Sequence, residues 1–209
     1  MEELLPLFPL NIVVYPGESL NLHIFEPRYI ELINDVYANN REFGMPAYIN
    51  NHIEYGCTLK VTEINKIYQD GKMDVKTMGN KIFRIVKFYN PTYGKLYAAG
   101  KVEYMENFDN SDYVLKEKIR TLVMDALNRM NVKKDVRLKE NFSTYDVAHI
   151  VGMSLNSRYE LLKIDNEKDR QEYMVEHLEK LIPIIDNLEE AKQRVNMNGQ
   201  FRNFNPLDF

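Results

Sequence analysis

The chain has 209 residues, 44% of them hydrophobic and 28% charged, which is ordinary for a soluble globular protein and excludes a disordered one. Its formal net charge of −4 gives no overall attraction to nucleic acid or anionic lipid. The single cysteine, Cys57, cannot form an intramolecular disulfide, and no segment is apolar for long enough to span a bilayer. The opening MEELLPLFPLNIVVYP is acidic and interrupted by prolines, unlike a signal peptide. We therefore expect a cytoplasmic protein without disulfides and without membrane contact.

The first half of the chain has the pattern of β-strands. Apolar runs at Leu4–Leu10 and Leu20–Ile24 are separated by the turn pair Pro16-Gly17. The alternating segment CTLKVTEINKIY is followed by Asp70-Gly71 and KMDVKTM, which together indicate a hairpin. Further strands are predicted in KIFRIVKFY and KLYAAGKVEYM, with Gly79 separating two neighbours. Five or more strands with short turns predict a closed or nearly closed antiparallel barrel.

After residue 107 the pattern changes to helix. Between Ser111 and Met130 apolar residues recur every three or four positions, which predicts a long helix. A second helix is expected to begin at Ser143 or Thr144, because both are good N-caps. The longest helix is predicted over Glu167–Val195, with a kink at Pro183 where a backbone hydrogen bond is lost.

The sequence therefore predicts an α+β protein in three parts. These are a β-barrel subdomain at 1–108, an α-helical bundle at 109–196 and an apolar tail at 197–209. The tail holds Phe201, Phe204, Leu207 and Phe209 without any helical or strand period. We expect it to fold back onto its own domain, since a tethered segment has a high effective concentration, and docking on another molecule is the alternative.

The stretch LHIFEPRYIELI, which begins at residue 22, predicts the junction of a strand and a helix. Pro27 fits the first helical position, where its missing N–H costs nothing, and Glu26 favours the positive end of the helix dipole. Phe25 can pack against the first turn as a hydrophobic staple. Arg28 can fold back toward Glu26, or stack on Tyr29 or Phe25. We expect this motif to anchor a helix across the barrel, with a ligand or partner contact as the second interpretation.

Several segments also carry a family resemblance. They are LPLFPLNIVVYPGESLNLHIFEPRY, FGMP, YGCTLKV, QDGKMDV and GNKIFRI. In this order they resemble the amino-terminal substrate-binding domain of the Lon protease family, and most of all its free-standing bacterial members. The resemblance covers the predicted barrel and continues more weakly through RYELLKIDNEKDRQEYMVEHLEKLI.

The resemblance implies a PUA-like, six-stranded pseudobarrel with one crossing helix, followed by an α-helical bundle. It also implies recognition of unfolded or extended polypeptide, and a separate protease as a possible partner in the cell. In full Lon proteases this region helps to capture substrates and supports assembly of the hexamer, so a homo-oligomer is compatible with it. A similar domain in cereblon attaches one folded partner, which gives a scaffold as the alternative function.

No catalytic apparatus is visible in the sequence. There is no Gly-x-x-x-x-Gly-Lys-Ser/Thr phosphate loop, and no segment resembles the Lon serine nucleophile followed by its lysine. Ser143, Asp146 and His149 lie three residues apart on one predicted helix, where they cannot form a nucleophile–base–orienter chain. Capping explains the first two better. We expect a protein that is not an enzyme and uses no cofactor.

Metal and RNA binding are weaker interpretations. Cys57 has no second thiol nearby and is expected to pack as a small apolar residue, while the histidines His23, His52, His149 and His177 are scattered. PUA-like barrels elsewhere bind RNA, and the basic segment KKDVRLK at 133–139 is the local candidate. It is short and the chain is acidic, so it is better explained as a solvated loop.

Our prediction is a non-catalytic protein that captures extended polypeptide. Apolar surface beside the barrel–bundle junction would supply most of the affinity, and an exposed strand edge would add backbone hydrogen bonds. We expect the binding groove to be bordered by the helix junction and by a loop at 43–55. The predicted binding residues are Phe25, Glu26, Arg28, Tyr29, Phe43, Met45, Tyr48 and Tyr55.

Overall fold

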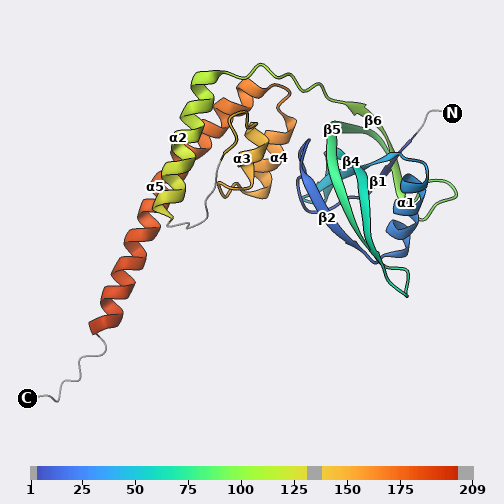
Figure 1. The fold of residues 1–209 in the computed structure, drawn as a ribbon, viewed down its shortest axis with the longest axis horizontal. Coiled ribbons are helices and arrows are strands. Elements are labelled where there is room, and N and C mark those ends of the chain that lie inside the picture. Colours follow the sequence, from blue (N-terminus) through green and yellow to red (C-terminus); the bar gives the residue numbers. More distant parts are fainter. Residues whose placement is uncertain (1–3, 131–137, 202–209) are drawn as a thin grey trace, which may run out of the picture. The chain divides into compact units, whose positions relative to one another are not determined.

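The computed structural model describes residues 4–130 and 138–201 of the chain. These residues form six strands and five helices (Figure 1). The strands are β1 (Leu5–Leu7), β2 (Ser19–Ile24), β3 (Glu42–Ile49), β4 (His52–Ile67), β5 (Met73–Tyr89) and β6 (Ala98–Tyr104). The helices are α1 (Pro27–Ala38), α2 (Tyr113–Arg129), α3 (Thr144–Ala148), α4 (Leu155–Lys163) and α5 (Glu167–Phe201). Most of the basic segment 133–139 and of the apolar tail lies outside the described residues, so both interpretations stay predictions.

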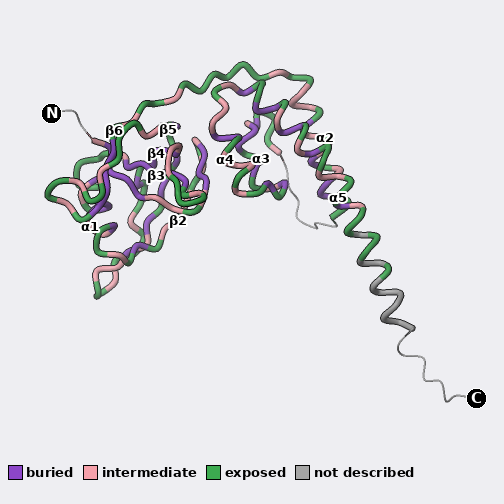
Figure 2. The backbone as a smooth tube through the Cα atoms, turned by 180° about the vertical axis from the view of Figure 1, so that it is seen from behind, coloured by how far each residue is buried: buried purple, intermediate pink, exposed green. Residues whose placement is uncertain are grey.

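The chain divides into two compact units. The barrel unit comprises the described residues of Met1–Asp109 and Met153–Asn166, and the helical unit those of Asn110–Gly152 and Glu167–Phe209. The segment 153–166, which contains α4, therefore packs with the strands, whereas the sequence-based division placed it in the bundle. In each unit, buried residues occur along the strands and helices among intermediate and exposed ones (Figure 2).

The sheet of the barrel unit has the order β2-β5-β4-β3-β1-β6, and a further pairing of β5 with β6 closes the ring. All pairings are antiparallel except β1 with β3, which is parallel, so the sheet is mixed rather than purely antiparallel. Strand β2 pairs with the first half of β5 and lies at one end of the sheet order. The ring is therefore closed by five strands, and β2 extends its wall on one side.

Strand β5 runs through Gly79, which the sequence analysis interpreted as a break between two strands. The glycine is needed for a different reason, because a Cβ at Gly79 would collide with the carbonyl oxygen of Tyr15. The chain before β2 crosses β5 there: Gly17 N–H donates to the Gly79 carbonyl (2.9 Å) and Gly79 N–H donates to the Glu18 carbonyl (2.8 Å). Close approach of two backbones, rather than a turn, explains the missing side chain.

Helix α1 supplies part of the barrel core. Leu32, Ile33 and Val36 are fully buried in one apolar cluster with residues of β3, β4 and β5. Cys57 belongs to the same cluster, which confirms that it packs as an apolar residue, and burial raises the pKa of its thiol to about 12. A second, smaller cluster around Leu5 and Leu7 fills the barrel between β1, β5 and β6.

The helices of the helical unit begin where capping side chains are available. Asp112 caps α2 by accepting hydrogen bonds from two backbone N–H groups (2.8 and 3.1 Å). Ser143 precedes α3, and its backbone N–H donates to the Asp146 carboxylate (2.8 Å) in a capping box. Helix α3 ends at Ala148, and α5 continues through Pro183 to Phe201.

Helix α4 was not predicted from the sequence. It packs against the barrel, where the Tyr15 hydroxyl donates to the Arg158 carbonyl (3.0 Å) and the Tyr55 N–H donates to the Tyr159 hydroxyl (3.2 Å). The rings of Tyr55 and Tyr159 meet edge to face, with their centroids 6.2 Å apart. These contacts join residues 143 and 104 positions apart, which local patterns cannot show.

Candidate functional site

The junction of β2 and α1 has the geometry expected of a helix start. Glu26 is the N-cap with extended backbone (φ −79°, ψ 133°), and Pro27 occupies the first turn. Arg28 donates from Nε to the Glu26 carboxylate (2.9 Å), and its guanidinium carbon lies 4.5 Å from the centre of the Tyr29 ring. Both contacts proposed for Arg28 therefore exist together. They fix the arginine over the first turn of α1.

A cavity of about 160 Å³ opens beside this junction. Its lining is mostly apolar and comes from the segment after β1, from β2 and from the start of α1: Phe8, Leu10, Leu22, His23, Ile24, Phe25, Glu26 and Tyr29. Phe8 and Tyr29 stack with ring centres 3.7 Å apart and form a rigid wall. Phe25 lies at the rim with 58% of its surface exposed. We name this space the hinge cavity.

The hinge cavity adjoins an edge strand. Within the part of the chain that the structure describes, β2 pairs only with β5, over six residues without a bulge. The Thr77 hydroxyl donates to the Leu20 carbonyl (2.9 Å), and Gly79 N–H donates to the Glu18 carbonyl, so these carbonyls face β5. Successive carbonyls along a strand point in opposite directions. Those of the residues between them, such as Asn21, therefore point to the outer edge.

A polar cluster holds His23 at the end of this strand. The Asp74 carboxylate accepts hydrogen bonds from His23 Nδ1 (2.6 Å) and from the Tyr68 hydroxyl (2.7 Å). The bond from His23, followed by that from Tyr68, lowers the pKa of Asp74. The His23 and Phe25 rings lie 6.1 Å apart. The cluster thus orients an imidazole and a phenyl ring toward the same rim.

The structure brings together one half of the predicted binding residues and separates the other half. Phe25, Glu26 and Tyr29 line the hinge cavity, and Arg28 lies over Tyr29. The segment 43–55, which was expected to border a groove as a loop, is instead part of the β3–β4 hairpin.

The four predicted residues of this hairpin have different environments. Phe43 and Met45 point into the core and are 0% and 2% exposed, so they offer no surface to a partner. Tyr48 is exposed, and its hydroxyl donates to the Asn51 side chain (3.1 Å). Tyr55 is held by α4. Alternation along a strand explains why Phe43 and Met45 share the inner face.

Sequence reasoning missed the other side of the cavity. Phe8 and Leu10 come from the segment after β1, and Leu10 pairs with Ala47 of β3, which no local pattern indicates. Leu22 and Ile24 were recognisable as the apolar positions of a strand, but not as cavity residues. Only the register of β2 with β5 places His23 opposite Asp74.

Other kinds of site find little support in residues 4–130 and 138–201. No three His, Cys, Asp or Glu side chains there lie close enough to hold a metal ion. In the same ranges no helix combines the length and the apolar character needed to cross a membrane. Ser143 and Asp146 form the capping box of α3, as expected from the sequence, and His149 follows at the C-cap.

Comparison with solved structures defines the class of fold. The chain resembles the Lon N-terminal domain protein from Xanthomonas campestris with a TM-score of 0.62 and 21% identity, covering 83% of this chain and 97% of that one. It resembles the N-terminal domain of a Mycobacterium avium complex Lon protease with a TM-score of 0.65 and 13% identity, covering 85% and 98%. The predicted α+β pseudobarrel with helices is thereby confirmed.

The sequence identifies the family. Residues 4–180 match the model of the ATP-dependent protease La (LON) substrate-binding domain, so the chain belongs to this family. The Lon protease of Cytophaga hutchinsonii is 22% identical over 213 aligned positions, which cover 92% of this chain and 26% of that protein. The chain thus spans about a quarter of this relative. The family and fold matches fall on the substrate-binding domain rather than a catalytic one, which supports a substrate-binding role.

Proposed function

We propose that the chain is a non-catalytic recognition protein that binds extended or partly unfolded polypeptide at the hinge cavity. One observation carries this proposal: a small apolar cavity opens beside the outer edge of β2, a regular strand. Membership of the substrate-binding family supports the same role.

The hinge cavity suits a side chain better than a cofactor. At about 160 Å³ it is smaller than the roughly 300–1,000 Å³ typical of small-molecule sites. Its wall of stacked Phe8 and Tyr29 rings and its aliphatic Leu10 and Leu22 favour an apolar or aromatic group. Phe25 at the rim would cover such a group on binding and lose its own contact with water.

The β2 edge can supply the remaining contacts. Natural proteins usually protect an edge strand with lysine, proline or a bulge, and SLNLHI contains no lysine or proline and pairs without a bulge. A peptide that adds to β2 as a further strand would donate to the outward carbonyls of alternate residues. Every second side chain of this peptide would then face the side on which Leu22 and the cavity lie.

A peptide-binding experiment tests the proposal. A fluorescent, uncharged peptide rich in Leu and Phe should bind the purified chain, and a version with Ser at the apolar positions should not. Phe25→Ala should raise the Kd by roughly 5- to 30-fold, which corresponds to about 1–2 kcal/mol for a rim aromatic. Phe108→Ala is the matched control, because Phe108 is similarly exposed (52%) and does not line the cavity.

Backbone N-methylation of the same peptide tests strand addition, because it removes donors and leaves the side chains intact. Weaker binding of the methylated peptide supports pairing with β2. Equal Kd values for the native chain and Phe25→Ala, or for the apolar and Ser peptides, would refute binding at the hinge cavity. Cleavage of a peptide or hydrolysis of ATP by the purified chain would refute a non-catalytic role.

A further inference from the structure

Strand β2 has backbone groups on its outer edge that form no hydrogen bond within the described part of the chain. The Leu20 carbonyl accepts a hydrogen bond from Thr77 of β5, so the N–H and C=O groups of the alternate residues Ser19, Asn21 and His23 point away from β5. Among the residues that the structure describes, no strand, turn or side chain pairs with these outward backbone groups. The three side chains are exposed as well. The outer edge of β2 can therefore accept another strand.

The sequence of this strand is nearly symmetric about Asn21. A leucine stands on each side, at Leu20 and Leu22, and a polar residue follows in each direction, Ser19 and His23. Strand β2 contains no lysine, arginine, aspartate or glutamate, so two copies of it do not repel each other. In an antiparallel pair, a two-fold axis at Asn21 places Leu20 of each copy opposite Leu22 of the other. Ser19 then lies opposite His23, and polar residues meet polar residues throughout.

In this register the outward backbone groups of the two copies satisfy each other. Ser19, Asn21 and His23 form three opposing pairs with about two hydrogen bonds each. Leu20 and Leu22 are partly buried against the barrel core, and Leu22 also lines the hinge cavity. Across the axis they form pairs without backbone hydrogen bonds, in which side chains approach most closely. The pairing therefore covers apolar surface beside the hinge cavity.

We propose that two copies of the chain associate by antiparallel pairing of their β2 strands, centred on Asn21. The sheets of the two barrel units then become continuous in the order β5-β2-β2-β5. A polypeptide bound as in the proposed function needs the same edge, so it and a second copy exclude each other. Self-association thus covers the edge until a polypeptide displaces the second copy. The pairing of two copies does not itself require that the chain bind other polypeptides.

Cysteine cross-linking tests the register. Opposing residues of a hydrogen-bonded antiparallel pair have Cα atoms about 5.5 Å apart, which is within the range of a disulfide. Ser19→Cys is the matched control for Asn21→Cys, because both positions are exposed on β2, but the two copies of residue 19 would lie at least about 13 Å apart. In an oxidising buffer, Asn21→Cys should form a disulfide-linked dimer at least about tenfold faster than Ser19→Cys. Cys57 is 0% exposed, so it does not compete.

Sedimentation equilibrium measures the association without a cross-link. A pairing of about five residues on each copy is a small interface, so we expect a dimer Kd on the order of 100 µM. Asn21→Lys places two lysines opposite each other at the axis and should raise this Kd about fivefold or more. Asn128→Lys makes the same substitution on the exposed surface of α2 and should leave the Kd within about twofold. Circular dichroism must show the same melting temperature for both variants.

The apolar peptide rich in Leu and Phe separates this proposal from the proposed function. The peptide should slow the cross-linking of Asn21→Cys, and an unchanged rate with bound peptide would show that the two do not share an edge. If the peptide binds but Asn21→Cys cross-links no faster than Ser19→Cys, the pairing of two copies is wrong and polypeptide binding is unaffected. If Asn21→Cys cross-links specifically but the peptide does not bind, only the proposed function fails.

Two further results would overturn the pairing. One is a molecular mass that stays at the monomer value up to about 1 mM protein, a concentration well above the expected Kd. The other is an equal effect of Asn21→Lys and Asn128→Lys on the dimer Kd, since the association would then use a different surface.

Discussion

Replacing Glu167 by alanine should destabilise the helical unit more than any exposed substitution there. Glu167 is 4% exposed at the start of α5. One oxygen of its carboxylate accepts hydrogen bonds from the Thr144 N–H and hydroxyl, both at 2.7 Å, and the other accepts one from Arg170 Nε at 2.9 Å. Arg170 is itself 2% exposed. A single carboxylate therefore ties the start of α3 to the start of α5.

The structure sets the size of the effect. Glu167→Ala removes the acceptor of two Thr144 donors, and it removes the carboxylate that pairs with the buried guanidinium of Arg170. Removing one partner of a buried ion pair costs about 3–5 kcal/mol. For a unit of this size, each kcal/mol lowers Tm by roughly 4–8 °C, so we expect a fall of about 12 °C or more. Glu167→Gln keeps an acceptor for Thr144 and should lose less.

Thermal and urea unfolding followed at 222 nm measures this change, because α2, α3 and α5 dominate the helical signal. Glu172→Ala is the control: Glu172 is an exposed residue of the same helix, and its replacement should change stability by less than about 0.5 kcal/mol. Replacing both Glu167 and Arg170 by methionine should recover part of the loss. If Glu167→Ala lowers the free energy of unfolding by less than about 1 kcal/mol, the Glu167 carboxylate does not stabilise the contact between α3 and α5 as we infer.

Three further predictions concern the barrel unit. Gly79→Ala should cost about 1–3 kcal/mol or more in urea unfolding, because its Cβ would collide with the neighbouring backbone. The Asp35 carboxylate is partly buried, which raises its pKa, but hydrogen bonds from Lys95 (2.6 Å) and Tyr97 (2.7 Å) outweigh burial and lower the pKa. The contribution of Asp35 to stability should therefore be present above about pH 4 and lost below it, and Asp35→Asn should flatten this part of the stability–pH curve. Cys57, with its raised pKa and no exposed surface, should react with a thiol reagent at pH 8 only after denaturation.

Each of these predictions has a contrary result. Native-like stability of Gly79→Ala would show that the two backbones separate without cost. If Asp35→Asn leaves the stability–pH curve unchanged, the Asp35 carboxylate does not contribute to the loss of stability at low pH. Rapid labelling of native Cys57 would mean that the barrel opens readily.

Local sequence patterns predicted the elements whose causes are local. Pro27 after Glu26 places the start of α1, and Asp70-Gly71 places the β4–β5 turn, where Gly71 has a positive φ of 83°. Gly79 was misinterpreted because a glycine in a strand has the same pattern whether it ends the strand or admits a crossing backbone. Helix α4 was missed because its partners, Tyr15 and Tyr55, lie 143 and 104 residues away from the residues that they contact.

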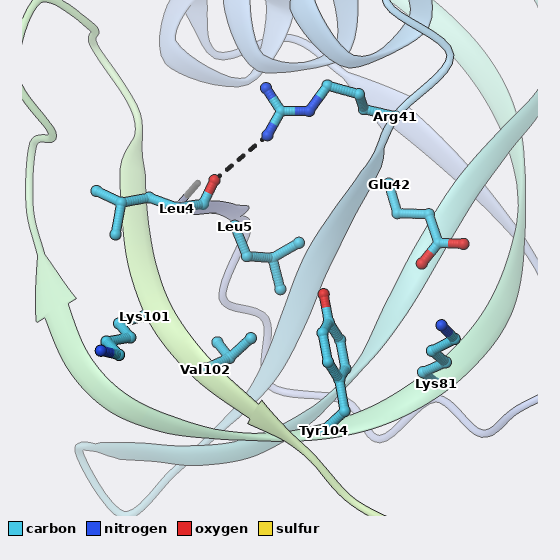
Figure 3. Close-up of a pocket in the computed structure, with 8 residues that line it drawn as sticks. All are labelled: Leu4, Leu5, Arg41, Glu42, Lys81, Lys101, Val102 and Tyr104. Atoms are coloured by element: carbon cyan, nitrogen blue, oxygen red, sulfur yellow. Dashed lines mark hydrogen bonds between the residues drawn. The ribbon is translucent and has the colours of Figure 1, made fainter. Parts of the chain in front are cut away.

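In the candidate site, too, residues that are neighbours in sequence could be predicted, and residues brought together by the fold could not. Phe25, Glu26 and Tyr29 lie close together in the sequence at one junction, and they line the same cavity. Phe43 is buried on the inner face of β3. Which face of β3 points to the core depends on the register of the β3–β4 hairpin, and the sequence pattern alone did not show this register. The hollow lined by Arg41, Lys81 and Lys101 (Figure 3) could not be predicted at all, because only the closed barrel brings these residues together.

The path of the chain also limits how this protein can be divided or recombined. The backbone leaves the barrel unit after Asp109, returns at Met153 and departs again after Asn166. A gene fragment ending at Asp109 would encode all six strands and yet lack the acceptor for Tyr15 and the hydroxyl that receives the Tyr55 N–H. Segment 110–152 is in effect an insertion within the barrel, so no single genetic crossover can exchange either unit intact with that of a relative.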